Sequence, residues 1–142
     1  MALPAMRNTQ LSLNHWPSSP SVSPLFLCVC ACSVFNNLKP AADLSTGSNY
    51  HIFKKGIAPK WEDPANAHGG RWIYTNPNKQ KQAKLNELWL HAVLAIIGEV
   101  LEVDDGPDGE VCGISLNIRK KEDRLCVWTR NAKDKERTIA MG

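Results

Sequence analysis

Trp61 and Glu62 are adjacent in the sequence, and together they could hold a flat, polar ligand. An indole offers a large π-face on which a nucleobase can stack, with a gain of about 1–3 kcal/mol per base. An ionised carboxylate can accept hydrogen bonds from N–H groups on the edge of that base. Arg71 follows soon after, and a planar guanidinium group suits phosphate oxygens. These residue types predict a site for a purine nucleotide.

A positively charged base would suit this pair well, because a cation is attracted to the negative face of an aromatic ring. Methylation of guanine at N7 makes the base cationic and strengthens its N1–H and N2–H donors, which Glu62 could accept as a charge-assisted pair. Arg119 and Arg124 would then join Arg71 at the phosphates. On residue types alone, Trp61 could also be a partly buried packing residue, and the two later arginines an exposed pair that contributes little.

Signatures of catalysis and of metal binding are missing from the sequence. It contains no nucleophile elbow, P-loop, paired-histidine zinc motif or dinucleotide fingerprint. The histidines and the clustered cysteines have spacings that suit no common metal site: His15, His51, His68, His91, Cys28, Cys30 and Cys32. We therefore predict a binding protein rather than an enzyme, with no catalytic residue, no metal and no cofactor.

Length and charge indicate one domain with a local nucleic-acid contact. The 142 residues suffice for a single buried core, and the net charge of +3 is small for a general binder of duplex nucleic acid. An odd set of five cysteines does not fit a secreted disulfide framework and favours a reduced, cytoplasmic protein. The apolar run at residues 25–35 is too short to cross a membrane as a helix, and the core of a signal peptide is the alternative for it.

Composition divides the chain at Ser33. Residues 1–32 are rich in Ser, Pro and Asn and then turn apolar without a sustained period, which predicts a segment that is disordered or unrelated to the domain. Residues 33–142 mix polar and apolar residues with frequent turn signals, which predicts the folded domain.

A strand is expected at residues 69–75, and a long helix at residues 81–103. One apolar stripe of the helix has the width of an ordinary core contact: Leu85, Leu88, Trp89, Ala92 and Ile96. A second stripe roughly doubles the apolar arc: Leu90, Leu94, Ile97 and Leu101. The second stripe predicts a further contact on that face.

Two more strands are expected at residues 110–119 and 124–129, joined by a charged loop at residues 120–123. A four-residue loop would set three cross-strand pairs: Arg119 with Arg124, Asn117 with Cys126, and Ser115 with Trp128. One face of this hairpin would then be apolar core. The other face would present two guanidinium groups and an indole.

Three stretches carry a family resemblance: GIAPKWEDPANAHGGRW, LNELWLHAVLAIIGE and VCGISLNIRKKEDRLCVWT. In this order and spacing they resemble the eukaryotic translation initiation factor 4E family, the messenger-RNA cap-binding proteins, in a form similar to fungal members. The resemblance covers residues 33–142. It implies an α+β fold in which a curved antiparallel sheet is backed by helices, here incomplete and preceded by a disordered segment.

The resemblance implies that the 7-methylguanosine cap is held on the concave side of the sheet between two tryptophans. Trp61 matches one of these stacking residues, Glu62 matches the acid that pairs with the guanine edge, and Trp128 matches the tryptophan near the N7-methyl group. Arg119 and Arg124 match the basic phosphate contacts. Arg71 matches the arginine that supports them.

The implied function is recruitment of capped messenger RNA to the ribosome. The resemblance further implies a cytoplasmic protein that is a monomer within a heteromeric complex and that does not bind a membrane. The partners would be the scaffold factor 4G and repressor proteins, which bind a convex helix face. The residues that match this face are Trp89, Leu90, Leu94 and Ile97. A protein-interaction module or decoy, which binds these helices without firm cap binding, is the alternative function.

The sequence departs from the family pattern at both ends. The second stacking tryptophan and a partner-binding tryptophan should precede Ser33, but Trp16 matches neither, and His91 replaces a commonly acidic residue. The family also continues past Gly142. Our hypothesis is that residues 1–32 come from an alternative exon or an unspliced intron, which transcript sequencing across the Ser33 junction tests. Loss of edge strands could also leave the chain without a stable fold, which a cooperative thermal melt would exclude.

Overall fold

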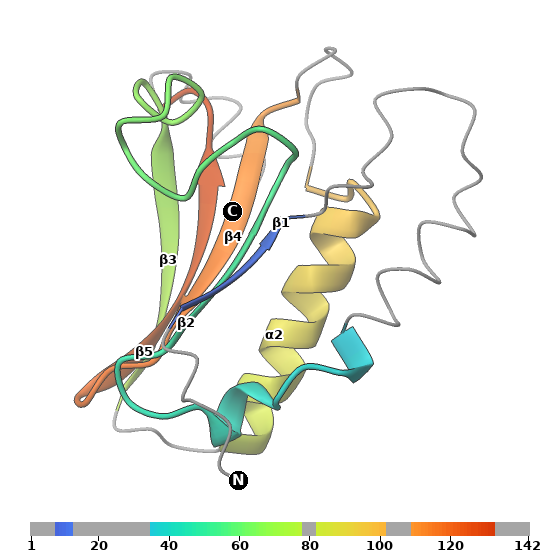
Figure 1. Cartoon of the computed structure of the whole chain (residues 1–142), viewed down its shortest axis with the longest axis vertical. Coiled ribbons are helices and arrows are strands. Elements are labelled where there is room, and N and C mark those ends of the chain that lie inside the picture. Colours follow the sequence, from blue (N-terminus) through green and yellow to red (C-terminus); the bar gives the residue numbers. More distant parts are fainter. Residues whose placement is uncertain (1–7, 13–34, 78–81, 102–108, 133–142) are drawn as a thin grey trace, which may run out of the picture.

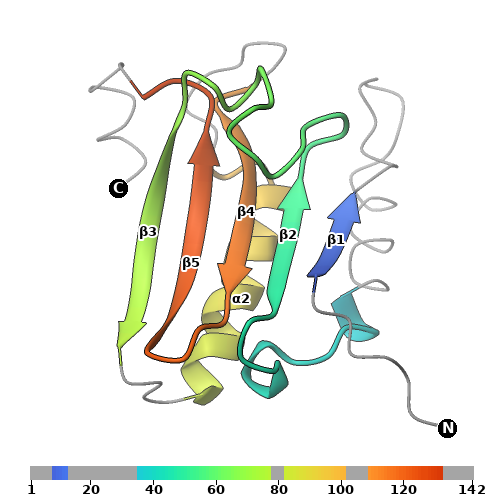
Figure 2. The same cartoon turned by 60° about the vertical axis from the view of Figure 1, so that its left-hand side comes forward.

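The computed structural model describes residues 8–12, 35–77, 82–101 and 109–132. They form five strands, one long helix and a short 3-10 helix: β1 Asn8–Ser12, η1 Ala41–Asp43, β2 Asn49–Phe53, β3 Gly70–Pro77, α2 Gln82–Ile97, β4 Val111–Asn117 and β5 Glu122–Thr129. The strands make one sheet in the order β1-β2-β4-β5-β3. Figure 1 shows α2 against one face of the curved sheet, and Figure 2 shows the strand order.

The antiparallel α+β architecture is confirmed. Strand β4 pairs antiparallel with β2 and β5, and β5 pairs antiparallel with β3. Because α2 covers β2 and β4 on one side, the opposite side of the sheet is left for other contacts. The predicted site residues on the strands lie on that opposite side.

Strand β1 differs from the sequence expectation. Residues 8–12 lie in the segment expected to lack regular structure, yet they pair parallel with β2, from Asn8 opposite Asn49 to Ser12 opposite Phe53. The open edge of a strand offers unpaired backbone N–H and C=O groups, and a segment can pair with them without any side-chain alternation. Composition and periodicity therefore carried no signal for this strand.

Helix α2 confirms the predicted helix but ends earlier than residue 103. Glu99 has a φ of 53°, in the left-handed region, and the N–H of Val100 donates to the carbonyl of Ala95 at 3.0 Å. This is a Schellman ending, in which a left-handed residue after the helix satisfies its last carbonyls. Glycine usually occupies that position and signals the end of a helix. Because Glu99 occupies it here, the sequence carries no such signal.

The core lies between α2 and the sheet. The buried apolar residues of this cluster come from the helix and from the central strands: Leu85, Trp89, Val93, Ile96, Tyr50, Ile52, Val111, Ile114 and Leu116. Fully burying one such side chain stabilises the fold by about 1.5–3 kcal/mol. Trp89 stacks on Tyr50 with ring centroids 5.9 Å apart, so the first predicted stripe of the helix is indeed core.

The β4–β5 register differs from the prediction by two positions. Arg124 pairs with Asn117 rather than Arg119, and Cys126 pairs with Ser115. The charged residues Glu122 and Asp123, expected in the loop, instead begin β5. A shift by an even number of residues keeps every side chain on its predicted face, because side chains alternate along a strand. The predicted assignment of side chains to the two faces of the hairpin is therefore correct, although the predicted register is wrong.

Candidate functional site

Two tryptophans meet at one end of the sheet, on the face away from α2. Trp61 lies in the loop between β2 and β3, and its ring centroid is 4.4 Å from that of Trp128 on β5, at an angle of 41°. Trp61 is 43% exposed, whereas Trp128 is buried. The structure thus brings together two predicted site residues from distant parts of the chain, and one of them presents an open π-face.

Trp128 is held in place from two sides. Its Nε1 donates to Ser115 Oγ at 3.1 Å, and its ring meets the Phe53 ring edge-on at 5.7 Å. Gly113 lies opposite Trp128 in the regular register of β4 and β5, and the register shifts only beyond this pair, between Gly113 and Val111. A Cβ atom at Gly113 would lie 2.5 Å from both the Ile52 carbonyl oxygen and the Phe53 ring, so only glycine allows this approach of the strands.

Arg71 lies close to both indoles. Its Cζ atom is 5.7 Å from the Trp61 ring centroid and 5.5 Å from that of Trp128. A guanidinium group at this distance from an aromatic face contributes about 0.5–1 kcal/mol at an exposed site. Arg71 therefore supports the tryptophan pair directly, while the resemblance implied a role beside the phosphate contacts.

The loop that carries Trp61 is held by two side chains that sequence analysis missed. The buried amide of Asn66 donates to the carbonyls of Ala58 and Lys60, at 2.7 and 2.9 Å. Asp63 accepts the N–H groups of Ala58 and Ala65, at 2.8 and 3.0 Å. The Asp63-Pro64 step was a turn signal that could have found one of them. Glu62 is exposed in the same loop.

Acid is expected to loosen this loop. The N–H groups of Ala58 and then Ala65 hold the pKa of Asp63 below its ordinary value of 3.8. A lowered folded-state pKa means that the stabilisation is present above the ordinary value and is lost as the pH falls through the folded one. Near-UV circular dichroism of the ligand-free protein should therefore change below about pH 4, and Asp63→Asn should show a loosened loop already at neutral pH.

The exposed acid Asp43 supplies the control for this experiment. Asp43→Asn should keep the parent spectrum at neutral pH and the parent acid transition. An Asp63→Asn variant with the same neutral spectrum and acid transition as the parent would contradict the anchoring role of Asp63.

Among the described residues, no carboxylate forms an ion pair with the guanidinium of Arg119. Its guanidinium donates to the Asn49 side-chain oxygen at 2.7 Å, and to the carbonyls of Ile118 and Ser48 at 2.9 and 3.4 Å. These acceptors are neutral, so they orient the group without removing its charge. An oriented cation of this kind is suited to a phosphate.

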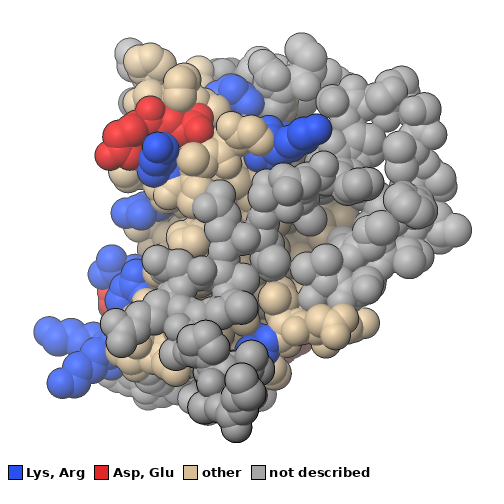
Figure 3. All heavy atoms as spheres, viewed as in Figure 1, with Lys and Arg blue, Asp and Glu red and all other residues tan. Residues whose placement is uncertain are grey.

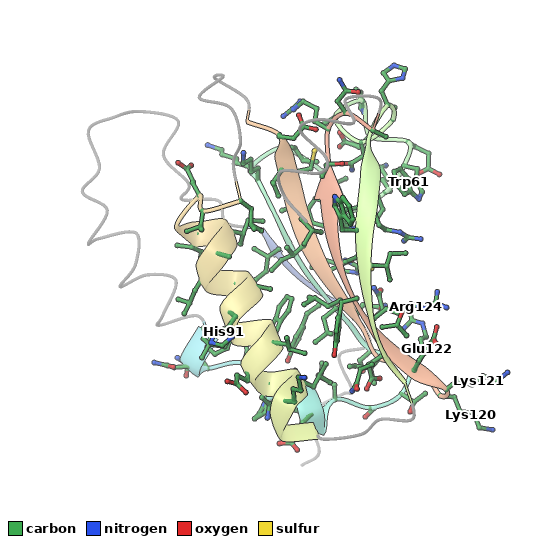
Figure 4. The ribbon with its side chains drawn as sticks, turned by 180° about the vertical axis from the view of Figure 1, so that it is seen from behind. Trp61, His91, Lys120, Lys121, Glu122 and Arg124 are labelled. Carbon is green, nitrogen blue, oxygen red and sulfur yellow. The ribbon has the colours of Figure 1, made fainter. Side chains whose placement is uncertain are left out.

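Arg124 is paired differently. Its Nε donates to Glu122 Oε1 at 2.7 Å, and Nη2 forms an ion pair with the same oxygen. Both side chains are partly exposed, so the pair contributes at most about 1 kcal/mol. Figure 4 shows Arg124 and Glu122 on the same side of the sheet as Trp61 and nearer the hairpin tip. A phosphate can compete with Glu122 for this arginine.

His51 is a half-buried group of β2 to which sequence analysis gave no role. It pairs with Ser115, which places it on the face of the sheet that carries Trp128. Burial, and to a lesser extent the charge of Arg119, lowers the pKa of His51 below its ordinary value. The imidazole is therefore neutral at neutral pH.

The predicted partner face of α2 is only partly accessible. Trp89 is 2% exposed and belongs to the core, so little of its side chain is open to a partner. Leu90 and Leu94 are exposed, while Ile97 is half-buried against the core. A groove of about 430 Å³ begins at Leu90 and is lined in part by Phe35, Leu38 and Trp89. The accessible apolar face thus consists of Leu90 and Leu94, with the groove beside them.

Three observations concern the part of the chain that the structure describes. It contains no group of three or more His, Cys, Asp or Glu side chains that could hold a metal ion. Burial raises the pKa of Cys112 to about 11, which suppresses its thiolate. No helix within the described residues is long and apolar enough to cross a membrane.

Comparison with known sequences decides the family. The family model for eukaryotic initiation factor 4E matches residues 30–142. The chain belongs to this family. It is 47% identical over 104 residues to eukaryotic translation initiation factor 4E-2 of Schizosaccharomyces pombe, covering 72% of this chain and 40% of that protein. It is 43% identical over 99 residues to initiation factor 4E of Candida albicans, covering 69% and 46% of the two chains.

Solved structures of 4E proteins share the fold. Ascaris suum eIF4E-3 in complex with the m7G cap matches with a TM-score of 0.72 and 35% identity, covering 78% of this chain and 60% of that one. Caenorhabditis elegans eIF4E-3, in complex with the 4E-binding protein Mextli and a cap analogue, matches with a TM-score of 0.68 and 37% identity, at the same coverage. This 4E family member spans about half the length of the curated relatives it matches.

Proposed function

We propose that this chain binds the 7-methylguanosine cap of messenger RNA, as a non-enzymatic translation initiation factor that acts in the cytoplasm. The observation that carries the proposal is the exposed indole of Trp61, held against Trp128 and Arg71 at one end of a face whose other end carries Arg119 and Arg124. The relative from Ascaris suum was solved with the m7G cap. The domain that performs this function comprises residues 33–142, and β1 of residues 8–12 pairs with its strand β2.

The base would stack on the open face of Trp61. A cationic methylated guanine gains both stacking energy and attraction to the ring, and Glu62 in the same loop accepts the N1–H and N2–H groups. The contacts of Asn66 and Asp63 hold this loop before the ligand arrives, which lowers the entropy cost of binding. Arg71 stabilises the indole pair from the sheet side.

The phosphates would run from Trp61 toward the hairpin. Arg124 lies four residues before Trp128 on β5, a separation of about 13 Å along the strand. Arg119 is oriented by neutral acceptors and offers its full charge, while Arg124 must exchange Glu122 for a phosphate. Arg119 is therefore the stronger of the two phosphate contacts.

A titration with two nucleotides tests the cap proposal. The protein is titrated with 7-methyl-GTP and with GTP, and tryptophan fluorescence is followed. We expect the methylated nucleotide to bind at least about tenfold more tightly, since only its base carries a positive charge at neutral pH. Equal affinity for the two nucleotides, or binding of neither, would refute the proposal.

We also propose that α2 docks an amphipathic helix of scaffold factor 4G or of a repressor protein, with this chain as the single 4E subunit of the complex. A relative of known structure was solved with a 4E-binding protein. Leu90 and Leu94 stand four residues apart on one exposed face of α2, a spacing that suits a helical partner with apolar anchors. The docking residues are thus Leu90, Leu94 and the exposed part of Ile97. Trp89 packs in the core and supports the helix that carries them.

Leu94→Ala should weaken the binding of a scaffold-factor peptide at least about fivefold, since truncating a central apolar anchor costs about 1 kcal/mol or more. Binding of 7-methyl-GTP should stay unchanged because Leu94 lies on the helix, across the sheet from Trp61. Pull-down with an immobilised peptide measures the first effect, and fluorescence titration measures the second. An unchanged pull-down would remove Leu94 from the docking face.

A protein-interaction module or decoy is the second candidate function. Among the described residues on the cap side of the sheet, only one indole is exposed, because Trp128 is buried beneath Trp61. A single stacking face would forfeit about 1–3 kcal/mol relative to two. Firm capture by the scaffold peptide without retention on immobilised 7-methyl-GTP would favour this function over cap binding.

A further inference from the structure

The tip of the β4–β5 hairpin presents a cluster of cations. Lys120 and Lys121 lie in the turn and are exposed, as are the nearby Arg119 and Arg124. Figure 3 shows basic side chains projecting at the lower left, where Figure 1 places this hairpin. We name Lys120 and Lys121 the basic tip.

The basic tip continues the line of the proposed cap site. Figure 4 shows Trp61, Arg124, Lys121 and Lys120 one after another down the same side of the sheet, opposite α2. Lys121 lies seven residues before Trp128, about 23 Å along an extended strand. A nucleotide whose base stacks on Trp61 would reach Arg124 with its phosphates, and only a longer chain would reach the tip.

The acids of the hairpin are already engaged. Glu122 is paired with Arg124, and the buried Asp123 accepts the N–H of Arg119 at 3.3 Å. Among the described residues, no carboxylate is paired with either lysine of the tip. The lysines therefore keep their positive charge available to an anion, on flexible side chains that can follow an irregular backbone.

We propose that the basic tip is a second binding surface, which contacts the phosphates of the single-stranded RNA that follows the capped nucleotide. A row of cations that continues from a nucleotide site matches the repeating charge of an RNA backbone. At this surface the lysines act as point charges and contact no bases, so they would raise the affinity for capped RNA of any sequence. This inference rests on the proposed cap-binding function.

The test uses 7-methyl-GTP, a capped single-stranded RNA of about ten nucleotides and the same RNA without a cap, with affinity measured over a range of salt. The variant is Lys120→Ser with Lys121→Ser. The matched control is Lys39→Ser with Lys84→Ser, which removes the same charge from exposed positions beside and on α2. Circular dichroism melts of both variants should match the parent.

We expect the tip variant to bind 7-methyl-GTP as the parent does, but to lose affinity for capped RNA. Each phosphate contact of a single strand contributes about 0.7 to the slope of log K against log salt, so two lost contacts should flatten that slope by about 1.4. Over a fourfold salt range this slope difference corresponds to about sevenfold in affinity. The control variant should keep the parent slope.

Different results would separate this inference from the function on which it rests. If the parent binds 7-methyl-GTP but the tip variant keeps the parent slope with capped RNA, the second surface is refuted and the cap site stands. An equal loss for 7-methyl-GTP and capped RNA would place the lysines in the cap site itself and also refute the inference. If the parent fails to bind 7-methyl-GTP, the proposed function fails and the inference falls with it.

Discussion

Trp61→Ala is expected to abolish detectable binding of 7-methyl-GTP while scaffold-peptide binding remains. The substitution removes the exposed stacking face, which contributes about 1–3 kcal/mol, and with it the attraction of the ring for a cationic base. Stacking alone corresponds to about 5- to 150-fold in affinity. Arg71 also loses one of the two rings that it contacts. Fluorescence titration and retention on immobilised 7-methyl-GTP measure the effect.

Trp72 is the matched control for this experiment. It is 42% exposed, against 43% for Trp61, but it alternates with Arg71 on β3 and so points to the other face of the sheet. Trp72→Ala should bind 7-methyl-GTP as the parent does. Comparable retention of the Trp61→Ala variant and the parent would exclude Trp61 as the base platform.

Leu116→Ala is expected to destabilise the fold by about 2–5 kcal/mol, the range for removing a fully buried leucine side chain. Leu116 lies on the central strand β4, opposite Tyr50 on one neighbour and Leu125 on the other, and its side chain is completely buried. Domains are typically stable by about 5–15 kcal/mol, so this one change removes much of the margin. Urea unfolding followed by far-UV circular dichroism gives the free energy of unfolding.

Leu94→Ala is the control for stability, because Leu94 is 46% exposed. It should cost far less than Leu116→Ala, since its side chain already contacts water. If both variants unfolded at the same urea concentration, the core would not lie between α2 and the sheet as described.

Periodic elements were predictable because burial imposes a repeat on the sequence. The core stripe of α2 and the apolar residues on the α2 side of β4 and β5 follow directly from the packing of the helix on the sheet. The hairpin register was not predictable from the same signal. Glu122 and Asp123 look like turn residues by charge, but they pair with Pro77 and Asn76 of β3. Strand β1 forms through backbone pairing, which leaves no mark on side-chain type.

The candidate site likewise has residues that were predictable from the sequence and residues that were not. Trp61, Arg71 and Trp128 were predicted from residue type and family pattern, and the structure brings them together. Asp63 and Asn66 were missed because side chains that anchor an irregular loop follow no period. Trp89 was placed in the core stripe by the helical wheel and on the partner face by the family resemblance, and the structure buries it in the core.

The four described tryptophans differ sharply in depth. Trp89 and Trp128 are enclosed by protein, whereas Trp61 and Trp72 are open to water on opposite faces of the sheet. Iodide in solution would therefore quench the fluorescence of Trp61 and Trp72 but not that of Trp89 and Trp128. Replacing Trp72 by phenylalanine would leave Trp61 as the one described emitter within reach of the quencher, so the chain contains its own optical reporter at the place where a nucleotide would arrive.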